Sequence, residues 1–217
     1  MGPLPTSAGA LRGWLTVGML NAPVDRPRVE EAVRELLAAV GDDPGRPGLG
    51  DTPRRVAEMY LEFFSGLGVD EVDLVRTSSV PADPGQLGEV VVVRDVAFRS
   101  VCEHHLLPFV GVAHVAYVPD QVIVGLGAVP RVLDAVASRP QLQERLGEQV
   151  ADALERGLGA KGVLVVLDAS HGCVTARGPR QAASTTVTVA SRGTLGGGAA
   201  RAEAVTLIGS SRCGADS

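Results

Sequence analysis

The sequence predicts an α+β domain in which two helices cover one face of an antiparallel sheet, preceded by a separate helical region. Two observations carry this prediction. Stretches rich in β-branched residues occur as two neighbouring pairs, and the chain between the pairs shows the apolar spacing of helices. Strands that follow one another directly tend to pair with each other. The order strand, strand, helix, helix, strand, strand therefore places both helices against one sheet.

The part of the chain before the first strand pair is predicted to hold two helices. Apolar residues recur at helical spacing from Val29 to Val40, and Gly41 ends this helix. A second helix follows Asp51, with Pro53 in its first turn, where the missing N–H of proline leaves no hydrogen bond unmade. We therefore divide residues 1–88 into three parts: a flexible tail at 1–25, an N-terminal helical region at 26–68, and a connector with Pro and Gly at 69–88.

Residues 89–212 are predicted to form the α+β domain itself. Its clearest element is a helix that begins near Pro140, because leucine or valine recurs at every fourth position from Leu142 to Leu158. From Gly193 onwards Gly and Ala dominate, and we expect a mobile tail there. The other expected elements are a helix at about Pro130–Ala137 and strands at Glu89–Phe98, Val112–Val118, Val163–Asp168 and Ser184–Ala190.

Composition argues against two classes of protein. The 217 residues carry a net charge of −5 with a pI near 5.4, whereas nucleic-acid-binding proteins usually present a basic face. The sequence contains no run of 18 apolar residues that could span a membrane, and its start lacks the basic segment and continuous apolar run of a secretory signal. We therefore expect a cytoplasmic protein that binds neither nucleic acid nor membrane.

The most informative feature of the sequence is a pair of short clusters of metal-ligating residues. Residues 102–105 are Cys-Glu-His-His and residues 171–173 are His-Gly-Cys, in a chain with only three cysteines and four histidines. Thiolate sulfur and imidazole nitrogen are the ligands of Zn²⁺ sites. The simplest assignment is three protein ligands, Cys102, His105 and Cys173, with water in the fourth position, as in catalytic zinc sites.

Two other interpretations of the clusters stay open at this point. A structural zinc would need a fourth protein ligand, which Cys213 or His104 could supply. A disulfide between Cys102 and Cys173 would need an oxidising compartment, and nothing in the sequence marks the chain as exported. If residues 171–173 are extended, His171 and Cys173 point to the same face and enter one pocket together.

Four motifs in order resemble those of GTP cyclohydrolase I, and the resemblance runs over about residues 28–209. They are Asp-Thr-Pro-Arg-Arg-Val-Ala-Glu-Met-Tyr at 51–60, Ser-Val-Cys-Glu-His-His-Leu-Leu-Pro-Phe at 100–109, Arg-Pro-Gln-Leu-Gln-Glu-Arg-Leu at 139–146 and His-Gly-Cys at 171–173. The resemblance implies the tunnelling fold (T-fold), a four-stranded antiparallel sheet with two helices in the order ββααββ. It also implies a toroidal homodecamer with active sites between subunits.

The resemblance further implies a reaction. The family opens the imidazole ring of GTP at C8, releases that carbon as formate and rearranges the ribose to give dihydroneopterin triphosphate. Zinc lowers the pKa of its bound water toward neutrality, which supplies a nucleophile for C8, and a general acid must protonate the purine nitrogen. His171 resembles the family's acid–base histidine, and His104 resembles the histidine that contacts the ribose. The alternative for His104 is a packed structural imidazole.

The remaining implied site residues bind the substrate, GTP or a related guanine nucleotide. Glu144 suits the N1–H and 2-amino edge of guanine, because a carboxylate accepts two hydrogen bonds. Gln143 is its weaker companion. Arg131 and Arg177 match the family's phosphate-binding arginines, and Arg55 matches one that another subunit contributes. Without the resemblance, a solvated ion pair would describe Glu144 equally well.

One segment departs from the family pattern. The family usually carries Gly-Leu-Ser-Lys at the ribose and triphosphate site, whereas residues 125–128 here are Gly-Leu-Gly-Ala. Gly127 and Ala128 therefore replace a hydroxyl and a positive charge. The leading hypothesis is a zinc-dependent GTP cyclohydrolase. One alternative is a ring-opening enzyme that acts on another purine or stops at a formamidopyrimidine, and another is a zinc T-fold protein that binds a purine without catalysis.

Overall fold

The computed structural model of the protein describes residues 24–86 and 88–210. Four long strands form an antiparallel sheet in the order β2-β3-β6-β7, and the short β5 adds to the edge beside β2 in parallel. The chain passes β2, β3, α4, α5, β6 and β7, which confirms the α+β class and the ββααββ order. The elements are β2 Val91–Cys102, β3 Pro108–Val118, α4 Ala128–Ala137, β5 Pro140–Gln141, α5 Gln143–Leu158, β6 Gly162–His171 and β7 Thr186–Gly193.

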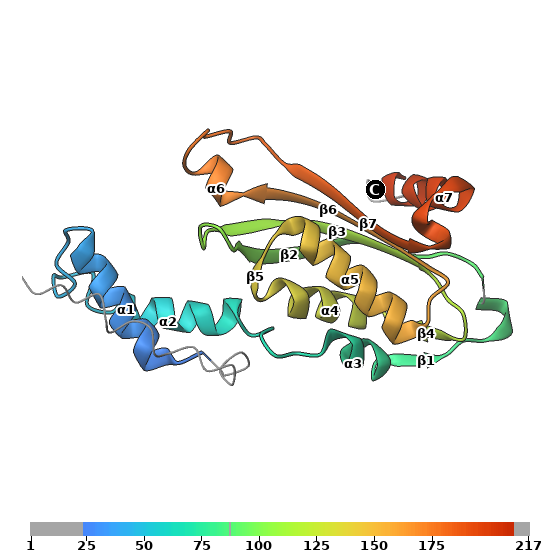
Figure 1. The fold of residues 1–217 in the computed structure, drawn as a ribbon, viewed down its shortest axis with the longest axis horizontal. Coiled ribbons are helices and arrows are strands. Elements are labelled where there is room, and N and C mark those ends of the chain that lie inside the picture. Colours follow the sequence, from blue (N-terminus) through green and yellow to red (C-terminus); the bar gives the residue numbers. More distant parts are fainter. Residues whose placement is uncertain (1–23, 87, 211–217) are drawn as a thin grey trace, which may run out of the picture.

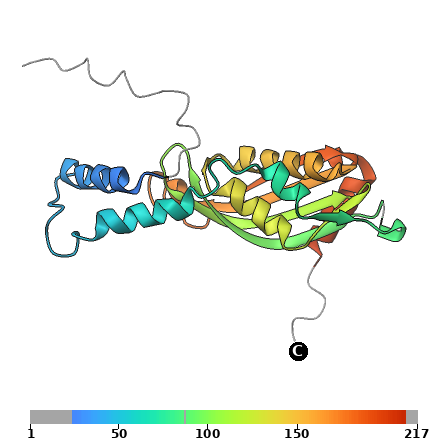
Figure 2. The ribbon, with the colours of Figure 1, turned by 90° about the horizontal axis from the view of Figure 1, so that it is seen from below.

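The main core lies between the sheet and the two helices α4 and α5 (Figures 1 and 2). Strand residues alternate between the two faces of a sheet, so every second residue of β3 and β6 points toward the helices. The predicted apolar stripe of α5 is confirmed for Leu146, Val150, Leu154 and Leu158, which are all buried, whereas Leu142 precedes the helix and is half-buried. On the strands, the residues that face them include Val115, Tyr117, Val163 and Val165.

The opposite face of the sheet is covered by the C-terminal segment. Here the alternate strand residues Ala116, Val118 and Leu164 pack against Leu195 and Ala204. These two residues belong to the short 3-10 helix η3 and to the helix α7, at Thr194–Gly196 and Gly198–Gly209. The prediction of a mobile tail from Gly193 is therefore wrong for the described residues, which end at 210.

The N-terminal helical region is present and forms a hairpin that projects from one end of the sheet (Figures 1 and 2). Its helices are α1 Arg26–Ala39 and α2 Thr52–Phe63, and α2 begins at the end of the hairpin remote from the sheet. Gly66 makes the junction, where its N–H donates to Ser138 O at 2.9 Å. A Cβ at Gly66 would lie 1.9 Å from Ala135 O, so only glycine fits.

Three expectations about boundaries need correction or lie outside the structure. The predicted connector contains the helix α3 (Glu71–Arg76), the strand β1 (Ser79–Pro81) and the 3-10 helix η2 (Pro84–Gln86), and β1 pairs with β4 (Val122–Val124). The helix expected near Pro140 begins at Gln143, because Pro140 and Gln141 pair with the end of β2 as β5. Most of the predicted flexible tail, residues 1–23, lies outside the described residues. The predicted domain boundaries themselves stay predictions.

In the described part of the chain, every helix is too short or too polar to cross a bilayer.

Candidate metal centre and active site

A tight loop between β2 and β3 presents the first metal-ligating cluster. Cys102 is the last residue of β2, and its carbonyl oxygen accepts from Leu106 N at 2.8 Å. Its own N–H donates to Leu107 O at 2.9 Å. Leu106 adopts a left-handed backbone with φ 53°, a conformation that costs a residue with a side chain about 1–2 kcal/mol. These contacts close the loop so that His105 turns back toward the sulfur of Cys102.

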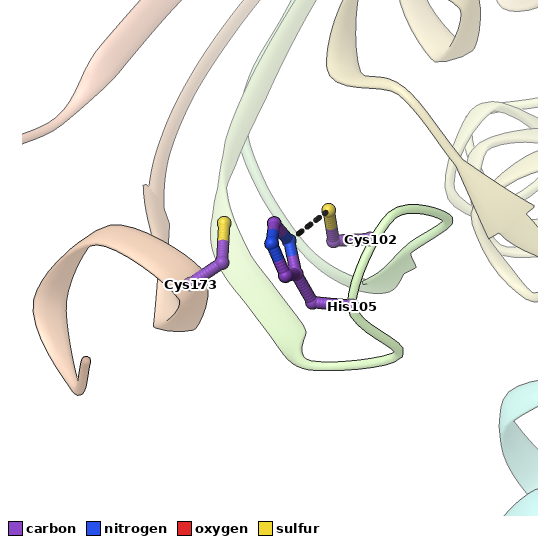
Figure 3. A group of neighbouring side chains, drawn as sticks. All are labelled: Cys102, His105 and Cys173. Carbon is purple, nitrogen blue, oxygen red and sulfur yellow. Dashed lines mark hydrogen bonds between the residues drawn. The ribbon is translucent and has the colours of Figure 1, made fainter. Parts of the chain in front are cut away.

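The three predicted metal ligands come together in the folded chain. The ligand atoms of Cys102, His105 and Cys173 all lie within 4.8 Å of one another, and Cys102 Sγ is 3.9 Å from His105 Nδ1 (Figure 3). Zn–S and Zn–N bonds of a tetrahedral site put two ligand atoms roughly 3.5–4 Å apart. Both thiols are free, so the structure contains no disulfide between Cys102 and Cys173. The donor set and the spacing fit a single Zn²⁺ ion.

The electrostatics of the two thiols favour a cation between them. Burial raises the pKa of the Cys173 thiol, and the neighbouring Cys102 raises it further, while Arg177 acts in the opposite direction. Two adjacent thiolates would repel each other, and a divalent cation removes that repulsion and favours deprotonation. Binding of the metal is therefore coupled to loss of thiol protons.

The expectation that residues 171–173 are extended, with His171 and Cys173 on one face, is wrong. Cys173 lies in the one-turn helix α6 (Gly172–Thr175) and not in an extended segment. It reaches the site because the chain turns directly after β6. The turn passes close to the β2–β3 loop, where a Cβ on Gly172 would lie 2.8 Å from Pro108 O. The alternative ligand Cys213 lies outside the described residues, and His104 is exposed.

His171 ends β6 beside Cys102, His105 and Cys173, the three predicted ligands that form the metal-ligating group. It is the cross-strand partner of Phe109, and the two rings stack at 4.6 Å between centroids with an interplanar angle of 7°. Its Nε2 lies 2.7 Å from Gln143 Oε1. Burial lowers the pKa of His171, and the Glu144 carboxylate raises it by a smaller amount. The imidazole is therefore mainly neutral at neutral pH, and a neutral imidazole can accept a proton before it donates one.

The first turn of α5 carries the two predicted base-binding residues, Gln143 and Glu144, which differ in burial and in their hydrogen-bond partners. Gln143 is 2% exposed, and its amide nitrogen contacts acceptors within the protein. Its donors are therefore not available to a substrate. Glu144 is exposed and forms no ion pair with any of the described residues, which does not favour the alternative of a solvated ion pair.

An ion pair that we did not predict ties α5 to the metal-ligating loop. Arg145 donates to both oxygens of Glu103, at 2.6 and 3.0 Å. The Arg145 guanidinium lowers the pKa of the Glu103 carboxyl. A bidentate pair of this kind fixes both groups in one relative orientation. No local pattern in the sequence could indicate it, because the two residues belong to different elements.

The three predicted phosphate-binding arginines occupy different places. Arg177 follows α6 and lies close enough to Cys173 to lower the pKa of that thiol. Arg131 is exposed in α4 and donates to Ser78 Oγ at 3.1 Å. Arg55 lies on α2, in the projecting hairpin, 3.7 Å from Asp51.

The two departures from the family pattern also differ in their surroundings. Gly127 caps the N-terminus of α4 and is exposed, and nothing lies within 4 Å of a Cβ built on it. Ala128 is 1% exposed and belongs to the main core. A serine therefore fits at position 127 without rearrangement, whereas a lysine at 128 would have to displace core atoms.

Comparisons with known proteins indicate the family of this chain. The family model of GTP cyclohydrolase I matches residues 29–209. The GTP cyclohydrolase 1 of Leifsonia xyli subsp. xyli is 62% identical over 192 residues, which cover 88% of this chain and 97% of the relative. Those of Caldanaerobacter subterraneus subsp. tengcongensis and Thermobifida fusca are each 47% identical, and the matches cover 87% and 90% of this chain and 100% and 94% of theirs.

Among solved structures, the archaeosine synthase QueF-Like in the apo form matches 48% of this chain and 93% of its own, with a TM-score of 0.40 at 15% identity. The sequence matches extend over almost the whole of each relative, and they include the segments that carry the Cys, His, Cys group. This chain therefore belongs to the GTP cyclohydrolase I family.

Proposed function

We propose that this chain is a zinc-dependent GTP cyclohydrolase I, which opens the imidazole ring of GTP at C8, releases formate and forms dihydroneopterin triphosphate. The observation that carries the proposal is the convergence of Cys102, His105 and Cys173 within 4.8 Å, beside His171. The fold brings these residues to one end of the sheet, where β2 ends, β3 begins and α5 starts. Membership of the family supports the same substrate.

Cys102, His105 and Cys173 would hold the zinc ion, which leaves one position of a tetrahedron open. When bound, Zn²⁺ supplies an activated water at neutral pH. His171 would exchange a proton with the imidazole-ring nitrogen of the purine, because a neutral ring can accept a proton and His171 lies two residues from a predicted metal ligand. Its stacking on Phe109 holds the ring in one plane during that transfer.

Glu144 would select guanine, because its carboxylate accepts hydrogen bonds from N1–H and the 2-amino group. Its charge also acts on His171, which supports a role for both groups in one site. Arg131 and Arg177 would bind the triphosphate, and His104 would contact the ribose. The exposure of all four side chains supports these roles.

We also propose a homo-oligomer, most simply a decamer, whose active sites lie between subunits. The support is the position of Arg55, on a helical hairpin that projects away from the sheet of its own subunit (Figures 1 and 2). A phosphate-binding arginine at such a place serves a neighbouring subunit more readily than its own. The cytoplasm stays the predicted compartment.

The function is tested by incubating purified, zinc-loaded protein with GTP and related purines and identifying the products by mass spectrometry. We expect formate and a pterin triphosphate from GTP. Ring-opened product without pterin would favour the altered endpoint, and turnover of a different purine alone would favour another substrate. Purine binding with no product at all would leave the non-catalytic alternative.

Replacing Glu144 with Ala should weaken binding of GTP. Loss of a charged hydrogen-bond partner at a desolvated base costs roughly 2–4 kcal/mol, which corresponds to roughly 30- to 1,000-fold in affinity. The measurement is KM for GTP together with the affinity of a slowly hydrolysed guanine nucleotide. Glu148→Ala is the matched control, because Glu148 lies one helical turn further along α5 and pairs with Arg192. Equal effects of both changes would contradict the role of Glu144.

A specific observation keeps the altered endpoint as a second candidate. Gly127 lacks the hydroxyl that the family pattern places beside the ribose, whereas the metal-ligating group, His171 and Glu144 are all retained. The ring-opening half of the reaction should therefore survive better than the ribose rearrangement. This second candidate predicts that wild-type protein accumulates ring-opened formamidopyrimidine, or its deformylated product, ahead of pterin.

Gly127→Ser should shift the products toward dihydroneopterin triphosphate, because the new hydroxyl fits in open space at the N-terminus of α4. Product ratios from mass spectrometry provide the measurement. Gly196→Ser is the control, since a Cβ at Gly196 also meets nothing within 4 Å but lies in η3, on the opposite face of the sheet. A wild-type enzyme that forms pterin without any ring-opened intermediate, and does not change on substitution, would contradict this prediction.

A further inference from the structure

The side-chain amide of Gln143 has one possible orientation in this fold. Its nitrogen lies 2.8 Å from Thr186 O, 3.1 Å from Leu167 O and 3.2 Å from Thr188 Oγ1. Backbone carbonyl oxygens only accept hydrogen bonds, so the group that faces them must be the NH₂ group. The opposite orientation would bring the amide oxygen against two carbonyl oxygens that cannot donate to it, at a position that is 2% exposed, and would leave only the Thr188 hydroxyl as a donor.

The orientation of the Gln143 amide determines which ring nitrogen of His171 carries a proton. With the NH₂ group committed to β6 and β7, the amide oxygen of Gln143 points at His171 Nε2, 2.7 Å away. An amide oxygen is an acceptor only, so a hydrogen bond of this length requires a proton on Nε2. In a neutral imidazole the other nitrogen, Nδ1, then carries the lone pair.

We propose that Gln143 is a positioning residue that holds His171 in the Nε2–H tautomer and makes Nδ1 the nitrogen that exchanges a proton with the substrate. The inference rests on the proposed catalytic role of His171, and it replaces the expectation that Gln143 binds the substrate. It holds in both charge states of the ring, because the Nε2 proton stays on the hydrogen bond to Gln143 whether Nδ1 is protonated or bare.

A second contact, the stacking of Phe109, restricts rotation of the His171 imidazole. The stacked ring of Phe109 is completely buried and lies parallel to His171 at 4.6 Å. Rotation of the imidazole about its Cβ–Cγ bond by 180° would break the hydrogen bond to Gln143 and present a C–H to the amide oxygen. Phe109 sets the plane of the ring and Gln143 sets its direction within that plane, so Nδ1 has one position relative to the metal-ligating group.

The backbone partners of Gln143 explain why a glutamine suits this place. Leu167 and Thr188 are cross-strand partners in β6 and β7, and Thr186 pairs with Ala169 nearby. Gln143, the first residue of α5, lies over these two strands. Its amide nitrogen contacts their backbone, and its amide oxygen reaches His171 at the end of β6. Gln143 thus anchors one imidazole to the rigid sheet, in the way that outer hydrogen-bond partners orient the working groups of enzymes.

The direct test is the tautomer of His171 in the zinc-loaded protein without substrate. Untagged protein labelled with ¹⁵N-histidine carries only four histidines, so magic-angle-spinning NMR resolves each ring and His171→Asn assigns the resonances. We expect a protonated Nε2 and a bare Nδ1 on His171. A bare Nε2 would overturn the proposal. This NMR measurement needs no turnover, so its outcome is independent of whether the proposed function is correct.

Two variants test the consequence for catalysis. Gln143→Met removes the acceptor and should give a mixture of tautomers with kcat lowered by about 10- to 100-fold and a much smaller change in KM. Gln143→Glu keeps an acceptor toward Nε2, and its second oxygen, once protonated, can donate to Thr186 O in place of the amide NH₂. This variant should therefore retain the wild-type tautomer and more of kcat than Gln143→Met. Thermal unfolding identifies any variant that fails to fold.

The matched control is Gln149→Met, which makes the same change on the same helix. Gln149 Oε1 accepts from Gln141 Nε2 at 2.7 Å and has no contact with His171. This variant should keep the wild-type tautomer and kcat. A folded Gln143→Met enzyme with the wild-type tautomer and kcat would overturn the proposal, and so would a loss of kcat in Gln149→Met equal to that in Gln143→Met.

Discussion

Cys173→Ser is expected to abolish GTP turnover and to reduce bound zinc well below one ion per chain. The three ligand atoms that lie within 4.8 Å include only two sulfurs, and removal of one leaves Cys102 and His105. A serine hydroxyl stays protonated at neutral pH and is a poor zinc ligand, whereas a metal-bound cysteine is deprotonated outright. Metal content by mass spectrometry of digested protein and formate release provide the two measurements.

The control for this substitution is Cys213→Ser, which should leave zinc content and turnover unchanged. Cys213 lies outside the described residues and is the alternative fourth ligand of a structural zinc. Loss of zinc in both variants would favour a closed four-ligand site over an open one. Full zinc content and turnover in Cys173→Ser would show that Cys173 is not a ligand.

The fold was predictable where a pattern extends over many residues. The stripe from Leu146 to Leu158 in α5 repeats over four turns, and the long strands carry runs of valine, so both kinds of element appear clearly in the sequence. Short elements carry no period. The helix α3 has six residues and β5 has two, and both form because of their partners, α5 and the end of β2.

The C-terminal helix α7 illustrates a different cause of error. Its twelve residues include glycine at both ends and four alanines, a composition that suggested a mobile tail. Alanine has the highest helix propensity, and small side chains allow close approach of the helix to the sheet, where Ala204 is completely buried. Composition alone could not distinguish a packed helix of small residues from an unstructured tail.

The site was predictable by residue type but not by contact. Cysteine and histidine clusters indicate metal chemistry because few other arrangements use them. The role of Gln143, in contrast, depends on the carbonyl oxygens of Leu167 and Thr186, which any residue would supply at those positions. Backbone acceptors leave no trace in the sequence, and so a residue that contacts them resembled a substrate ligand until the fold was known.

His171→Ala is expected to keep one zinc per chain and to lower kcat by about 10²-fold or more, the usual contribution of a positioned acid–base group. His171 is not among the three residues whose ligand atoms converge, so its removal leaves the metal-ligating group complete. The substitution also removes the stacking on Phe109, and some loss of stability should accompany the loss of rate. Single-turnover rates, zinc content and thermal unfolding separate these effects.

His114→Ala shows what a purely structural histidine should do. His114 lies in the middle of β3, and its Nδ1 accepts from Asp95 N at 3.2 Å, where the register of β2 shifts and Asp95 has φ 57°. Removing this acceptor should lower the unfolding temperature and leave kcat unchanged. A His171→Ala enzyme that behaves in the same way, less stable but equally fast, would place the proton transfer elsewhere. Loss of rate with zinc retained, beside a His114→Ala enzyme of normal rate, would assign the proton transfer to His171.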